Sequence, residues 1–148
     1  MIDSKWCKSC PEWATLILRI TVGIPFFLHG SQKVFGAFGG GGLTGTAGFL
    51  TQLGFPMPEL MAYLLGFTEF LGGLGLLLGL GTRIFAALLA FTMAVAIFKV
   101  HLKNGFFASQ GGFELPFILL GACLALVCTG CQKWGLDCIL HKKCCSTD

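Results

Sequence analysis

The sequence predicts an all-α protein, a four-helix transmembrane bundle. Hydrophobic residues make up 55% of the 148-residue chain and charged residues only 11%, whereas soluble domains carry about 25% charged residues. Four apolar stretches approach the length of about 20 residues that a spanning helix needs. They run over residues 13–28, 60–80, 84–100 and 115–131. We therefore expect one membrane domain over residues 1–148, with a cysteine-rich tail at residues 132–148.

A short helix is expected between the first and second apolar stretches. This connection is too long to be an idle loop in so small a protein. Leu43, Ala47 and Leu50 recur in it at helical spacing. The pattern predicts a helix over Thr44–Leu53 that lies at the outer membrane interface or folds back over the bundle.

The second stretch is rich in glycine. Gly75 and Gly79 form a small-xxx-small pair, which lets a neighbouring helix backbone approach closely. Gly72 and Gly73 lie on the helical face of Glu69. We therefore expect free space beside the Glu69 carboxylate.

The positions of lysine and arginine predict that both termini are cytoplasmic. The side with both termini and the short turn after the second stretch carries Lys5, Lys8, Arg83, Lys133, Lys142 and Lys143. The opposite side carries Lys33, Lys99 and Lys103. Basic residues accumulate on the cytoplasmic side of membrane proteins. The net charge of +3 is modest and spread along the chain, so we expect no nucleic-acid partner.

Ionisable residues occur in or against all four apolar stretches. A charge at membrane depth costs about 2.5–3.5 kcal/mol, so it is retained where it faces a partner, water or a ligand. In the predicted topology the outer half of the bundle holds His29, Glu69, Lys99, His101 and Glu114, and Arg19 lies in the inner half. These groups predict an outward-facing polar pocket between His29, Glu69, His101 and Glu114.

A structural role for the same residues remains open. Arg19 would then neutralise Glu69, while the residues at the rim would be ordinary interfacial side chains, which is the interpretation we favour for Lys99. The two histidines would bind a metal only if they converge with Glu69 or Glu114, and sequence spacing does not show this.

The eight cysteines lie near the two ends of the chain. The pairs Cys7/Cys10 and Cys128/Cys131 have CxxC spacing, and together they could bind zinc or an iron–sulfur cluster. We favour instead thiols that pack as small hydrophobic groups or carry lipid. On a reducing cytoplasmic face, structural disulfides are not expected.

The order of several short motifs resembles the DoxX family of small four-helix bacterial membrane proteins. The motifs are Leu18-Arg19, His29-Gly30 with Lys33, Leu53-Gly54-Phe55-Pro56, Glu69-Phe70-Leu71-Gly72-Gly73, Gly79-Leu80-Gly81-Thr82-Arg83, His101, Glu114 and Gly135-Leu136-Asp137. The resemblance implies a location in the bacterial cytoplasmic membrane. It also implies that the ligand-pocket positions are Arg19, His29, Lys33, Glu69, His101 and Glu114. The family is named for a subunit linked to thiosulfate oxidation with quinone as acceptor, and its pattern does not include the cysteine-rich ends.

The sequence therefore favours an integral membrane subunit linked to redox metabolism, whose outer polar pocket binds a quinone or a small oxyanion. No redox centre is visible in the chain, so we expect a protein partner or a homo-oligomer within the lipid bilayer. Two alternatives stay open. One is a non-enzymatic scaffold or chaperone subunit of a larger complex, and the other is a membrane thiol–disulfide oxidoreductase that uses the CxxC pairs.

Overall fold

All regular structure in the described part of the chain is helical. The computed structural model describes residues 4–131 and 134–140, and the side chains of residues 13–131 and 134–139. The helices are α1 (Ser4–Phe35), α2 (Gly42–Gln52), α3 (Pro58–Leu78), α4 (Thr82–Ala96), α5 (Glu114–Thr129) and α6 (Leu136–Leu140). A single π-helical turn, Ile97–His101, continues α4. The predicted all-α class is confirmed.

Within the described residues, three helices are long and apolar enough to cross a membrane. The candidate spans are Trp13–Phe35, Pro58–Leu78 and Thr82–Asn104, whereas α5 is a shorter apolar helix of 16 residues. The first span is longer than predicted, because polar side chains at His29 and Lys33 do not end a helix. The helix ends only where Gly36 adopts a left-handed conformation with φ of 69°.

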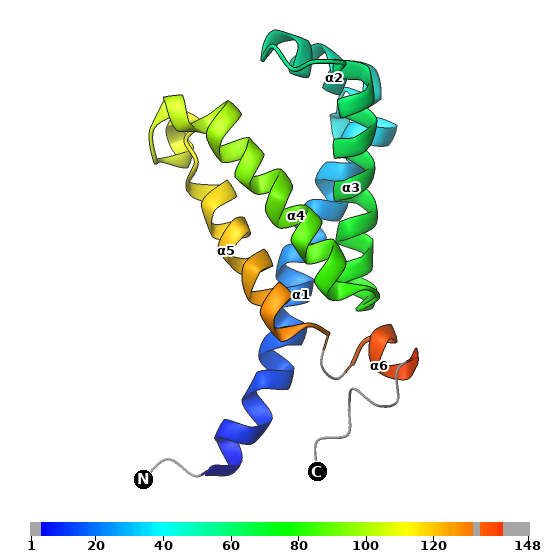
Figure 1. Cartoon of the computed structure of the whole chain (residues 1–148), viewed down its shortest axis with the longest axis vertical. Helices are drawn as coiled ribbons and strands as arrows, with labels where there is room; N and C mark the ends of the chain where they lie inside the picture. Colours follow the sequence, from blue (N-terminus) through cyan, green and yellow to red (C-terminus); the bar gives the residue numbers. More distant parts are fainter. Residues whose placement is uncertain (1–3, 132–133, 141–148) are drawn as a thin grey trace.

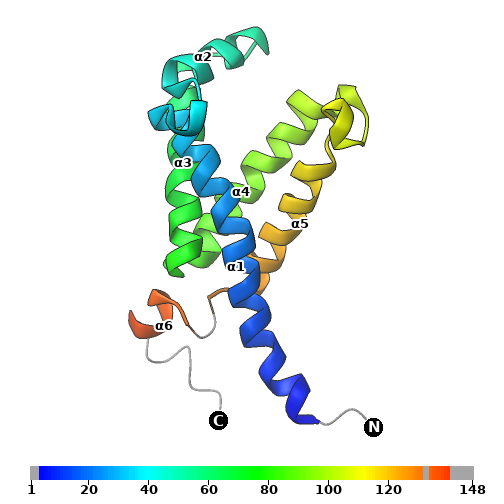
Figure 2. The same cartoon turned by 180° about the vertical axis from the view of Figure 1, so that it is seen from behind.

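The helices form two units that meet near one end of the molecule. One unit is α1 packed along α3, with α2 across their ends, and the other is the α4–α5 hairpin. We call the end that carries α2 the outer end and the end that carries α6 the inner end. Figures 1 and 2 show α4 and α5 crossing the first unit toward the inner end and diverging from it toward the outer end.

The close contact of α1 with α3 depends on two glycines. A Cβ atom at Gly30 would lie 2.2 Å from the backbone nitrogen of Phe70, and one at Gly73 would lie 2.3 Å from that of Phe27. Neither position leaves room for a side chain, so the two backbones touch. The predicted small-xxx-small pair, Gly75 and Gly79, does not serve a single helix contact. Gly75 faces the Phe85 ring of α4, and Gly79 faces the Arg19 guanidinium.

The apolar core lies where the two units meet. Val22 and Phe26 of α1 join Leu89 of α4 and Leu126 of α5 in one buried cluster. Because the hairpin then turns away from α1, the same face of α1 is less covered farther out. This divergence decides which polar residues are buried.

The predicted helix between the first two spans is present as α2. Its buried residues are Thr46 and Leu50, and it packs mainly against α3 and α1. The Thr46 hydroxyl donates to the Gly42 carbonyl at 2.8 Å. This helix therefore closes the outer end of the α1–α3 unit.

Candidate functional site

A buried carboxylate on α3 forms an ion pair with a lysine on α1. Glu69 is 2% exposed, and its Oε2 accepts a hydrogen bond from Lys33 Nζ. The Lys33 side chain remains 29% exposed. An ammonium group has three hydrogens to donate, so Lys33 can hold Glu69 and still offer a donor toward its open side.

The space that was expected beside Glu69 is filled. A Cβ atom at Gly72 would lie 3.0 Å from the Leu89 side chain of α4, and Gly73 is against the α1 backbone. The prediction of free space on this face of α3 is therefore wrong. The glycines allow helix contact rather than a cavity.

One stripe of α1 carries both the buried core residues and the polar residues. At intervals of three or four residues, which place side chains on one helical face, it contains Thr15, Arg19, Val22, Phe26, His29 and Lys33. The first four are at most 3% exposed. His29 is exposed and Lys33 is half-buried, since the α4–α5 hairpin no longer covers this face near the outer end (Figure 1).

An aromatic cluster lies near the contact of α1 with α3. The Phe27 and Phe70 rings stack with centroids 5.1 Å apart, and Phe35 meets Phe70 edge-on at 5.2 Å. On the wheel of α1, Phe27 and Lys33 lie on opposite sides of Gly30. The open side of the ion pair is thus the side that bears His29.

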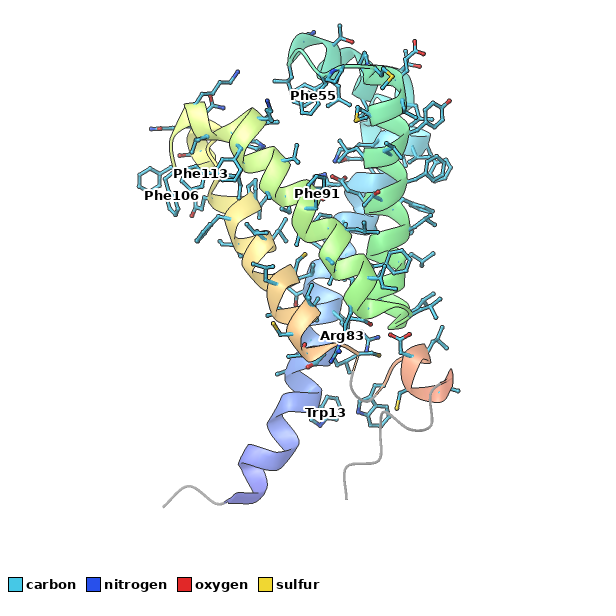
Figure 3. The ribbon with its side chains drawn as sticks, in the orientation of Figure 1. Trp13, Phe55, Arg83, Phe91, Phe106 and Phe113 are labelled. Atoms are coloured by element: carbon cyan, nitrogen blue, oxygen red, sulfur yellow. The ribbon has the colours of Figure 1, made fainter. Side chains whose placement is uncertain are left out.

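The two other predicted pocket residues belong to the α4–α5 turn. His101 Nδ1 is 2.7 Å from the Gly111 carbonyl oxygen, which also accepts from the Asn104 amide at 3.1 Å. Glu114 Oε2 accepts from the Ala108 backbone N–H at 2.9 Å. These bonds fix the conformation of the turn, which also contains Phe106 and Phe113 (Figure 3). The structure therefore places His101 and Glu114 away from Lys33 and Glu69.

Arg19 occupies a separate site at the inner end. It is 1% exposed, and its Nε donates to the Leu76 carbonyl at 2.9 Å. Its Nη2 donates to the Leu77 carbonyl at 3.2 Å, and its Nη1 to the Trp134 carbonyl at 3.3 Å. The last carbonyls of a helix lack intrahelical partners and carry partial negative charge. Arg19 thus caps α3, and its bonds lie two turns from Glu69.

Asp137 places a negative charge at the N-terminus of α4. Its Oδ1 accepts from the Gly81 N–H at 2.7 Å and its Oδ2 from the Thr82 N–H at 3.1 Å, where α4 begins. Its own N–H donates to the Gly79 carbonyl at 2.9 Å. Negative charge is favoured at a helix N-terminus. Sequence reasoning assigned Asp137 no role, although it belonged to a motif with Gly135.

Cys131 lies at the same place as Arg19 and Asp137. We call this group of residues the inner clamp, and it consists of Arg19, Gly79, Cys131, Gly135 and Asp137. The Cys131 Sγ donates to the Gly79 carbonyl at 3.3 Å and lies 3.5 Å from Arg19 Nη1. A Cβ atom at Gly135 would lie 1.9 Å from this sulfur. Three sequence motifs that are distant along the chain therefore meet at one point. Nearby, Trp13 (Figure 3) and Trp134 have ring centroids 5.9 Å apart.

The described cysteines differ in exposure and in whether they form a disulfide. Cys128 is an exposed free thiol, and Cys123 and Cys131 are buried free thiols. Cys138 is disulfide-bonded, so the expectation that this end lacks disulfides does not hold. The side chains of Cys7 and Cys10 lie outside the described residues. Among those described, no group of three or more His, Cys, Asp or Glu side chains could hold a metal ion.

The fold and these sites define a small multi-pass helical membrane protein. The DoxX family model matches residues 14–102, a range that includes Arg19, Lys33 and Glu69. The chain belongs to the DoxX family.

Curated relatives cover most of the chain. It is 37% identical over 131 residues to the protein named "Putative oxidoreductase CatD" from Bacillus subtilis (strain 168), covering 88% of this chain and 90% of that one. It is 32% identical over 133 residues to an uncharacterized protein of Haemophilus influenzae, covering 85% of this chain and 90% of the relative. No solved structure matches significantly.

Proposed function

We propose that this chain is a membrane subunit of an oxidoreductase, and that Lys33 and Glu69 bind a small redox-active molecule. One observation carries the proposal: the ion pair is buried on its carboxylate side and open on its ammonium side. A buried pair of charged residues at membrane depth is costly. Charged residues that are nevertheless present there are candidates for a functional site. The relative named as an oxidoreductase supports a redox association.

The chemistry of the open side favours a ligand that presents oxygen atoms. Lys33 Nζ would donate to a quinone carbonyl or to a small oxyanion. His29 lies one turn away on the same stripe, and an imidazole can both accept and donate a proton, so it suits proton exchange with a bound quinone. Reduction of a quinone to a quinol takes two electrons and two protons. In this proposal the protons pass through His29 and Glu69, and the electrons come from a partner subunit.

Replacement of Lys33 by methionine should weaken ligand binding about tenfold or more, which corresponds to about 1.4 kcal/mol. The reason is that either ligand class loses its main donor. Glu69→Gln separates the classes: quinone binding should weaken with loss of the proton-exchanging carboxylate, whereas oxyanion binding should strengthen with loss of a competing negative charge. The measurement is thermal stabilisation of the nanodisc-embedded protein by a short-chain ubiquinone and by thiosulfate.

Matched controls come from the α4–α5 unit. Lys99→Met and Glu114→Gln change the same residue types at positions away from the ion pair, so both should bind ligand like the wild type. The double variant Lys33→Met/Glu69→Gln avoids an unpaired buried carboxylate and checks that the loss is not one of folding. Equal binding by Lys33→Met and Lys99→Met would contradict the proposed site.

The scaffold alternative is favoured by a different observation. Arg19, His101 and Glu114 are bonded to backbone groups of their own fold, as structural residues would be. If neither probe stabilises the wild type, and if Lys33→Met and Glu69→Gln change only stability, the polar residues serve the fold and the scaffold function is the better account.

We also propose that α5 crosses the membrane as a fourth span and that both termini are cytoplasmic. The support is the excess of lysine and arginine in the sequence near the two termini and in the short turn between α3 and α4. A C-terminal green fluorescent protein fusion should fluoresce, because this reporter folds in the cytoplasm, and an alkaline phosphatase fusion at the same point should be inactive. The reverse pair of results would place the inner end outside the cell.

A further inference from the structure

The two described thiols of the Cys128/Cys131 pair differ sharply in their surroundings. Cys128 is exposed on the last turn of α5, and Arg83 donates to its backbone carbonyl at 3.5 Å. Cys131 is 8% exposed and forms part of the inner clamp. One thiol is therefore open to reagents, and the other is a structural contact between helices.

The sulfur of Cys131 contributes to the clamp as a thiol. Its S–H donates to the Gly79 carbonyl at the end of α3, and the sulfur lies beside the Arg19 guanidinium. It rests against Gly135, where even a methyl group would collide with it. A disulfide sulfur carries no hydrogen, so oxidation of Cys131 removes the bond to Gly79 in any geometry.

The clamp also holds the segment that follows α5. Trp134 accepts from Arg19, and Asp137 bonds to Gly79, Gly81 and Thr82. A change at Cys131 therefore acts on the bonds that fasten this segment to α3 and α4.

We propose that Cys128 and Cys131 form a reversible dithiol site for a disulfide oxidant, and that their oxidation releases residues 134–138 from the adjoining ends of α3 and α4. The CxxC spacing is that of known dithiol–disulfide exchange pairs, and a bond between the two sulfurs requires the Cα atoms to come within about 7 Å of each other. The proposal does not rest on the Lys33–Glu69 site, so either can fail while the other stands.

The exchange runs in two steps. The Cys128 thiolate attacks one sulfur of the oxidant R–S–S–R, forming Cys128–S–S–R, and the leaving thiolate takes up the proton that Cys128 lost. Cys131 then gives up its proton and displaces the second R–S⁻, which leaves as R–SH. The two cysteines lose two electrons and two protons as their S–S bond forms, and the oxidant becomes two thiols. In the second step Cys131 must leave its place beside Gly79.

The test treats the full chain in nanodiscs with oxidised glutathione and then with dithiothreitol. Peptide mass spectrometry should show a Cys128–Cys131 disulfide that the reductant reverses. Hydrogen exchange should rise at least tenfold for peptides that contain Gly81, Thr82 and Asp137, whose amides are bonded in the clamp. Cys128→Ser should show neither change, while Cys123→Ser, which alters a buried thiol outside the pair, should behave like the wild type.

Two results would overturn the proposal. In the first, Cys128 carries glutathione while Cys131 stays reduced. In the second, the disulfide forms but exchange at Gly81, Thr82 and Asp137 is unchanged, which would show that the thiol of Cys131 does not fasten the segment. Cys131→Ser keeps a hydrogen-bond donor at this position. It should form no Cys128–Cys131 disulfide and should keep the slow exchange in the presence of the oxidant, which separates the effect of that disulfide from the effect of a misfolded protein.

Discussion

Replacement of Arg19 by alanine should be the most destabilising single change in the inner half of the protein. The guanidinium donates to the buried Leu76 carbonyl, to the partly buried Leu77 carbonyl and to the Trp134 carbonyl. A hydrogen bond to a charged group contributes about 1.5–3 kcal/mol. We therefore expect a loss of at least about 3 kcal/mol in the free energy of unfolding, measured by unfolding in sodium dodecyl sulfate from mixed micelles.

Arg83 provides the matched control. It is exposed, and its described hydrogen bond is one contact of 3.5 Å to the Cys128 carbonyl, so Arg83→Ala should cost less than about 1 kcal/mol. Arg19→Lys should be intermediate, because an ammonium lacks the planar fork that reaches several acceptors together. If Arg19→Ala is no less stable than Arg83→Ala, the guanidinium does not hold α3 to the segment after α5.

Replacement of Gly30 by alanine should force α1 and α3 apart. The new Cβ would lie 2.2 Å from the Phe70 backbone nitrogen and 2.5 Å from its Cα, and backbone atoms cannot move aside as a side-chain end can. Overpacking costs about 1–3 kcal/mol, and we expect the upper part of this range. Because Lys33 and Glu69 bond across the same contact, ligand binding should fall together with stability, as measured by unfolding and by the thermal-shift assay.

Another helical glycine gives the control for this change. A Cβ atom at Gly121 of α5 would meet no atom within 4 Å, so Gly121→Ala should be neutral or should stabilise the protein by about 0.5–1 kcal/mol. Gly73→Ala, which meets the Phe27 backbone, should resemble Gly30→Ala. Equal stability of the Gly30 and Gly121 variants would show that the backbones do not touch.

The shared α1 stripe explains why residues of the same chemical type have different roles. Arg19 and Lys33 are both basic and lie on one face of α1, yet Arg19 is covered by the meeting of the two units and Lys33 is not. The divergence of the α4–α5 hairpin, a property of the whole fold, leaves Arg19 buried as a helix cap and Lys33 partly exposed.

The sequence by itself determined the helical class, the membrane environment and the presence of α2. These follow from hydropathy and helical periodicity, which are properties of short segments. It also indicated that Glu69 is important, since a carboxylate within an apolar helix is costly wherever the helix packs.

Only the tertiary structure decided which residues contact one another. It paired Glu69 with Lys33 instead of Arg19, filled the expected space at Gly72 with Leu89, and placed His101 and Glu114 on a separate turn. It also brought Cys131 and Asp137 to the ends of α3 and α4. These contacts join residues that are distant in sequence. They depend on how the helices cross and diverge, and no local pattern in the chain encodes that geometry.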